Sequence, residues 1–168
     1  MARPPRVTDS RSGCDQPRTF FVSSQTAGRR ALFQSERMAE LLIDVLRTNA
    51  LSGRFTIHDF VVMPNHMHLL ITVPGDLSIE KVVQLIKGGL SYRAKRELGC
   101  TSEIWQKGFS EVGVRDRESF LRHREYIEQN PVTAGLAGSP EAFPFGSSYF
   151  KRRKYGLQDP ANTVISSG

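Results

Sequence analysis

Residues 61–73 constrain the fold most strongly, because two apolar stretches there are separated only by Pro64-Asn65. The second stretch carries His66 and His68 two positions apart. Side chains alternate between the faces of a strand, so both histidines share one face. The apolar residues assigned to the opposite face are Met67, Leu69, Ile71 and Val73. The pattern predicts a strand with a core on one side and two imidazoles on the other, which is typical of a metal site. The alternative is a pair of histidines with a structural role.

The remainder of the chain alternates strand and helix patterns. We expect strands over residues 19–25, 55–63, 66–73 and 110–114, with the hairpin of 55–63 and 66–73 at the centre of the sheet. Helices are predicted after Ser35 and Ser78, and a third begins after Asp116 and ends near Asn130, because proline follows. This order predicts an α+β, ferredoxin-like antiparallel sheet with helices on one face, plus an extra C-terminal helix.

The length and composition predict one domain with two extensions. We expect a flexible basic arm over residues 1–18, a domain over 19–150 and a flexible basic tail over 151–168. The two cysteines have no C-x-x-C spacing, which excludes a disulfide framework and a zinc ribbon and favours the cytoplasm. No apolar run approaches the roughly 20 residues of a membrane span, so no membrane is expected as a partner.

The charge favours a polyanionic partner. Lysine and arginine number 23 against 17 acidic residues, a formal net charge of +6. The helix after Ser78 carries a cluster suited to phosphates and base stacking, made of Lys87, Tyr92, Arg93, Lys95 and Arg96. A solvated helix end is the alternative. Gly88-Gly89 in the same helix indicates close approach, either by protein packing or by a nucleic-acid phosphate.

The last predicted helix supplies a candidate nucleophile. Arg122, Tyr126 and Asn130 are spaced four apart and share one face. If the Asn130 carbonyl completes the site begun by the histidines, the Tyr126 hydroxyl lies near the same metal ion, beside a Lewis acid. Arg122 joins the candidate DNA contacts. The alternative is an ordinary amphipathic tyrosine and a C-terminal asparagine cap.

Three motifs together resemble the REP-associated tyrosine transposases of the HUH superfamily. These are relatives of the small single-stranded-DNA transposases of insertion sequences. The motifs are Met-Pro-Asn-His-Met-His-Leu-Leu at 63–70, Trp-Gln-Lys-Gly-Phe at 105–109, and Tyr-Ile-Glu-Gln-Asn-Pro-Val at 126–132 followed by Gly135-Leu136. The resemblance spans about residues 19–150 and rests on the joint occurrence of the motifs.

The resemblance implies a metal-dependent endonuclease and strand transferase that cleaves through a 5′-phosphotyrosine intermediate. Tyr126 matches the nucleophile, and the ligands of a divalent ion, Mg²⁺ or Mn²⁺, match His66, His68 and Asn130. The implied partner is single-stranded DNA with hairpin or palindromic repeats, bound by a monomer or homodimer. A non-catalytic nucleic-acid-binding regulator on the same fold is the alternative function.

Overall fold

The computed structural model describes residues 16–154, so most of both predicted extensions lies outside the described residues. The main elements in this range are β1 (Arg18–Gln25), α1 (Glu36–Leu51), β2 (Thr56–Met63), β3 (His66–Val73), α2 (Ile79–Leu98), β4 (Ser110–Val114), α3 (Arg117–Thr133) and α4 (Ser147–Lys154). The predicted N-caps are confirmed, since the first-turn amides of α1, α2 and α3 donate to the side chains of Ser35, Ser78 and Asp116.

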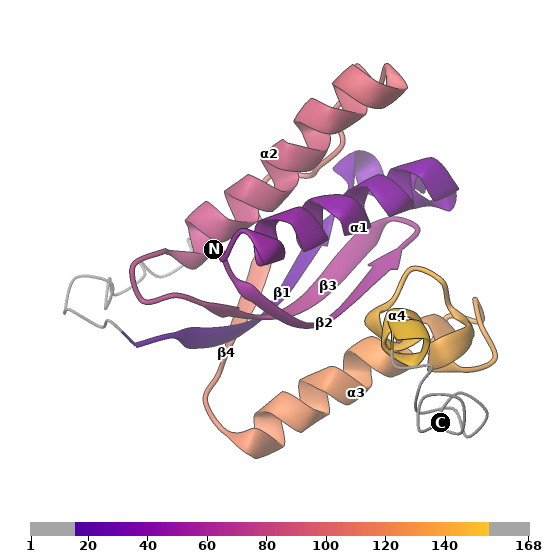
Figure 1. Cartoon of the computed structure of the whole chain (residues 1–168). Helices are drawn as coiled ribbons and strands as arrows, with labels where there is room; N and C mark the ends of the chain where they lie inside the picture. Colours follow the sequence, from indigo (N-terminus) through magenta and orange to yellow (C-terminus); the bar gives the residue numbers. More distant parts are fainter. Residues whose placement is uncertain (1–15, 155–168) are drawn as a thin grey trace, which may run out of the picture.

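The four strands form one antiparallel sheet in the order β2-β3-β1-β4. Helices α1 and α2 cover one face, and α3 lies on the other face (Figure 1). Each face has its own apolar cluster, the larger one beneath α1 and α2 and a smaller one around Leu70 and Ile127. The predicted ferredoxin-like arrangement with an extra helix is confirmed. No helix of residues 16–154 is long and apolar enough to cross a membrane.

Strand β2 lies at an edge of the sheet, so the prediction that both hairpin strands are central is wrong for β2. Its outer edge is covered by a later segment, because the Val62 N–H donates to the Phe145 carbonyl over 2.8 Å and Val61 forms a bridge with Gly146. A strand that is apolar on both faces is expected to be buried, but the pattern does not say what buries it. Here a loop covers the edge of β2 in place of a fifth strand.

Helix α2 runs without interruption through the glycine pair. A Cβ on Gly89 would lie 3.2 Å from Cγ1 of Val45 in α1, whereas a Cβ on Gly88 would meet no atom within 4 Å. Gly89 therefore allows close approach of α1 and α2, which favours the protein-packing alternative at this position.

Helix α3 continues past Asn130 to Thr133, so the predicted end at Asn130 is wrong. Pro131 is buried inside the last turn, where it removes one N–H donor without ending the helix. The exit is a Schellman closure, in which the Leu136 N–H donates to the Pro131 carbonyl and Gly135 adopts a φ of 74°.

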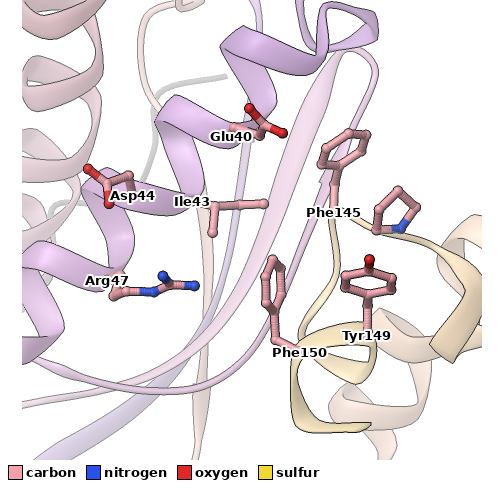
Figure 2. A pocket seen from close by; sticks show the side chains of 8 residues that line it. Glu40, Ile43, Asp44, Arg47, Phe145, Tyr149 and Phe150 are labelled. Carbon is pink, nitrogen blue, oxygen red and sulfur yellow. The ribbon is translucent and has the colours of Figure 1, made fainter. Parts of the chain in front are cut away.

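Helix α4 replaces the first part of the predicted flexible tail. It extends to Lys154, and its Phe150 ring lies 6.1 Å from the Phe60 ring and 5.6 Å from the Arg47 guanidinium carbon. Figure 2 shows Phe150, Tyr149 and Phe145 opposite α1, across a pocket of about 300 Å³. Residues 151–154, which were expected in the flexible tail, are therefore helical, because a basic sequence also forms a helix when one face packs on the domain.

A buried carboxylate joins α3 and α4 to β2. Asp59 is 0% exposed, and its Oδ2 accepts a hydrogen bond from Arg124 Nε of α3 over 2.7 Å. Its Oδ1 lies 2.6 Å from Lys151 Nζ of α4 and also accepts a bond from Ser147 Oγ at 3.1 Å. A buried charge is stable only when it is paired and hydrogen-bonded, so Asp59 requires both helices to dock.

Replacing Asp59 with alanine should therefore loosen both helices. Arg124 and Lys151 are partly exposed and regain water, so we expect a loss of about 3 kcal/mol in the free energy of unfolding, at the low end for a broken buried pair. Chemical denaturation measures it. The exposed carboxylate Asp76 provides the matched control, and Asp76→Ala should change stability by less than about 0.5 kcal/mol. Equal stability of the two variants would contradict this account of the fold.

Candidate active site

The paired histidines lie on the face of β3 that α3 covers. Their ring centroids are 4.8 Å apart. The alternate residues Met67, Leu69, Ile71 and Val73 belong to the core on the opposite face. The predicted division of β3 into an apolar face and an imidazole face is confirmed.

Hydrogen bonds orient both imidazoles. His66 Nδ1 lies 2.7 Å from Asn65 Oδ1, which only accepts, so Nδ1 carries the proton and Nε2 keeps its lone pair. His68 Nδ1 lies 2.6 Å from Ser23 Oγ of β1, and the same tautomer fits this contact. Ligating histidines commonly use one ring nitrogen for such a bond and the other for the metal. The orientation therefore suits two Nε2 ligands.

Burial keeps both rings uncharged at neutral pH. It lowers the pKa of His68 to about 4, with a further contribution from the neighbouring His66. Burial also lowers the pKa of His66, assisted by the positive charge of Arg29. Only a neutral imidazole offers a lone pair to a metal ion, so the environment of the pair suits metal binding.

Tyr126 reaches this site from α3. Its ring centroid lies 5.3 Å from that of His68 and 5.8 Å from that of Phe21, both in edge-on contacts. The side chain is nonetheless 53% exposed. One chain thus brings a solvent-accessible phenol next to its own histidine pair, where a phosphate can approach from solvent.

Helix α3 runs antiparallel to β3 across this face. Near its start, the Phe120 ring packs 5.1 Å from His58, and His58 Nε2 lies 2.6 Å from Thr72 Oγ1, near the end of β3. Further along the helix, Tyr126 contacts His68, near the start of β3. Moving forward along α3 therefore means moving backward along β3.

This direction supports Asn130 as a third ligand. From Tyr126 to Asn130 the helix rises about 6 Å, and from His68 back to His66 the strand covers about 6.6 Å. These two lengths are similar, and the position of Asn130 beside His66 stays a prediction. Within residues 16–154, no three His, Cys, Asp or Glu side chains gather as a metal site, and the role of Asn130 as a third ligand stays a prediction.

The predicted DNA-contacting residues fall on two sides of the sheet. Arg122 is exposed on α3, 3.9 Å from Glu118, on the side of the histidines. The others are on α2, across the sheet, and two of them already have protein partners. Lys87 Nζ donates to the Gln106 and Gly108 carbonyls, and Arg93 pairs with Asp44 and Glu97. Tyr92, Lys95 and Arg96 are exposed. A role of these residues in DNA binding stays a prediction.

Three residues that orient the histidines or hold α3 in place are not identified by the sequence analysis. Asn65 directly precedes the histidine pair, and its position in a tight turn is a local signal that identifies it. Ser23 and Asp59 have no such local signal. The contact of Ser23 with His68 depends on the pairing of β1 with β3. Asp59 accepts hydrogen bonds from residues that lie 65 and 92 positions further along the chain.

Fold and site together define a transposase-like DNA-processing protein. A family profile described as "Transposase IS200 like" matches residues 22–130, which include the histidine pair, Tyr126 and Asn130. The chain belongs to this family.

Individual proteins of this family are similar to the chain in sequence. The REP-associated tyrosine transposase of Escherichia coli K12 is 28% identical over 133 residues, which cover 77% of this chain and 75% of that protein. A putative REP-associated tyrosine transposase of Haemophilus influenzae is 29% identical over 96 residues, which cover 51% of this chain and 54% of that protein. The predicted resemblance to this group is confirmed.

Two solved structures share the fold. One is a REP-associated tyrosine transposase bound to a REP hairpin, with a TM-score of 0.63 and 29% identity, covering 79% of this chain and 77% of that one. The other, a putative transposase from Deinococcus radiodurans, has a TM-score of 0.52 at 20% identity and covers 70% and 93%.

Because the folded chain holds His68 in its neutral form, we expect the protein to lose stability in acid. The unfolded chain protonates His68 near its ordinary pKa of 6.5, whereas the folded chain does so only at about 4. The free energy of unfolding should be fully retained above about pH 7 and should fall between the two values, by roughly 1 kcal/mol per pH unit for this residue. Urea titrations with EDTA measure it. His68→Gln should flatten the dependence, and an unchanged slope would contradict the assignment.

Proposed function

We propose that this protein is a divalent-metal-dependent endonuclease and strand transferase for single-stranded DNA with hairpin repeats. The observation that carries the proposal is the contact between Tyr126 and His68, with ring centroids 5.3 Å apart, on a face where both histidines are oriented and neutral. A nucleophile and two metal-ligand candidates thereby meet at a site open to solvent.

The donor set fits a divalent ion. His66 and His68 would supply Nε2 and Asn130 its carbonyl oxygen, three neutral ligands that leave the full charge of the ion for a phosphate. An amide oxygen with water and phosphate favours Mg²⁺ or Mn²⁺ over zinc. When bound, the ion supplies Lewis-acid polarisation of the scissile phosphate and stabilises the departing oxygen.

Tyr126 acts as the nucleophile. Its oxygen forms a bond to phosphorus as the bond from phosphorus to the 3′ oxygen breaks, and the phenolic proton is lost as the 3′ oxygen gains one. The product is a 5′-phosphotyrosine and a free 3′ hydroxyl. Because one phosphodiester replaces another, a 3′ hydroxyl can attack the tyrosine link and join strands without an external energy source.

Hairpin DNA is the proposed partner because a relative with 29% identity is bound to a REP hairpin in its solved structure. The net charge of +6 favours a polyanion as well. Arg122 lies on the same face of α3 as Tyr126, and we propose that it contacts the DNA backbone. Since Tyr126 lies against His68 of its own chain, a monomer already contains both groups.

Tyr126→Phe should abolish the covalent DNA adduct and leave DNA affinity within about twofold, since the change removes one hydroxyl and no charge. The assay incubates hairpin-bearing single strands with protein and Mn²⁺, followed by denaturing electrophoresis. Tyr149→Phe is the matched control, because Tyr149 is also a helical tyrosine but lies on α4, at the pocket facing α1. Adduct formation by Tyr126→Phe would exclude Tyr126 as the nucleophile. Binding without any adduct in the wild type would support the regulator alternative.

Mn²⁺ should raise the melting temperature of the wild type and should not do so for His66→Ala or His68→Ala, because a weakly held ion is lost with one of its ligands. Differential scanning fluorimetry with Mn²⁺ or EDTA measures the shift without requiring DNA. His123→Ala serves as the control, since this ring packs on Phe21 from α3 and is not among the proposed ligands. An equal metal-induced shift in all variants would assign the histidine pair a structural role.

A further inference from the structure

An exposed arginine follows β1 close to the start of the histidine pair. Arg29 lies in a short 3₁₀ turn (Ala27–Arg29), and its N–H donates to the Thr26 carbonyl over 3.0 Å. The Thr26 N–H donates in turn to the carbonyl of Asn65 over 2.9 Å, and Asn65 directly precedes His66. Arg29 is therefore one turn of chain away from a residue that is bonded to the neighbour of a histidine.

The guanidinium of Arg29 has no protein partner. The residue is exposed, and its side chain makes no hydrogen bond or ion pair with another residue of 16–154. Burial is the larger cause of the lowered pKa of His66, and the positive charge of Arg29 is the other. Because the interaction of two charges weakens with distance, the guanidinium lies near this imidazole. It is available to an anion that approaches the histidines from solvent.

The adjacent Arg30 has a different role. Its Nε donates to the Ala27 carbonyl over 3.2 Å, and its guanidinium also donates to the carbonyl of Glu103. The Ala27 N–H donates to the Ile104 carbonyl over 2.8 Å. These bonds tie the turn to the segment before β4. One arginine of the pair thus fixes the turn, and the other extends from a support that is already ordered.

The backbone of Arg29 is in the left-handed region, with a φ of 55°. No other non-glycine residue within 16–154 has a positive φ. A side chain disfavours this conformation because its Cβ approaches the following carbonyl oxygen, whereas glycine adopts it readily. Strained residues in a well-fixed segment are concentrated at functional sites. The strain at Arg29 therefore indicates a function for its side chain, since glycine would suit the backbone better.

We propose that Arg29 binds a non-bridging oxygen of the phosphate that lies at the histidine pair. The proposal rests on the proposed function, in which this phosphate is the scissile one. A guanidinium stays charged and can donate to two phosphate oxygens at once. Negative charge builds up on these oxygens as the Tyr126 oxygen bonds to phosphorus, and a cation already in place stabilises it. Arg29 is then a further catalytic residue beside Tyr126.

The test is equilibrium binding of hairpin DNA by Tyr126→Phe protein in EDTA, so that neither cleavage nor a metal ion contributes. The hairpins carry a single-stranded flank in which each linkage in turn is an uncharged methylphosphonate. We expect one linkage at which the loss of charge weakens binding about tenfold, as for one charge-assisted hydrogen bond. Adding Arg29→Ala should reduce this ratio to about twofold or less, and Arg29→Lys should retain part of it.

Two further variants separate this contact from other effects. Arg54→Ala is the matched control and should keep the tenfold ratio, because Arg54 is exposed before β2, at the end of the hairpin opposite the paired residues Met63 and His66. Arg29→Gly should lose the ratio while its melting temperature stays the same or rises, since glycine relieves the left-handed backbone. With Tyr126 retained, Arg29→Ala should slow adduct formation about a hundredfold.

A ratio near one at every linkage, or a tenfold ratio that persists in Arg29→Ala, overturns the proposal, as does an absence of DNA binding. A lower melting temperature of Arg29→Gly overturns it too, because the residue is then structural. So does a wild-type adduct that maps to a linkage other than the sensitive one. The proposed nuclease fails separately: a sensitive linkage that depends on Arg29, combined with no adduct in the wild type, retains the phosphate contact and rejects the chemistry.

Discussion

The buried carboxylate of Asp59 holds the parts of this structure together. With no exposed surface, it requires the pairing that Arg124 of α3 and Lys151 of α4 provide, at 2.7 and 2.6 Å. Arg124 precedes Tyr126 by two residues on the same helix. The ion pair that secures α3 against β2 therefore lies within one turn of the tyrosine that contacts His68.

The alternation of β3 allows one strand to build a core and a reactive site together. Its apolar side chains complete the cluster under α1 and α2, while His66 and His68 face α3. Burial against that helix lowers the pKa of both imidazoles, and the contacts to Asn65 and Ser23 fix their orientation. The same packing that stabilises the fold thus keeps both imidazoles neutral.

Local patterns in the sequence predict much of this architecture. The two-residue period of β3, the caps at Ser35, Ser78 and Asp116 and the four-residue spacing of Tyr126 and Asn130 depend on neighbours in the chain. The edge position of β2 and the docking of α4 do not, because both depend on contacts between distant segments. The end of α3 is not predicted by Pro131 alone, because the Schellman closure at Gly135 lies beyond it.

The proposed metal site consists of His66, His68 and Asn130 and lies beside Tyr126. A crystal structure of the protein with Mn²⁺ and uncleaved hairpin DNA, analysed at the manganese absorption edge, tests it most directly. The account predicts one anomalous peak in contact with both Nε2 atoms and the Asn130 carbonyl oxygen, with the scissile phosphate between the ion and the Tyr126 hydroxyl. A peak at other residues, or a scissile phosphate bound away from the histidine pair, would contradict it.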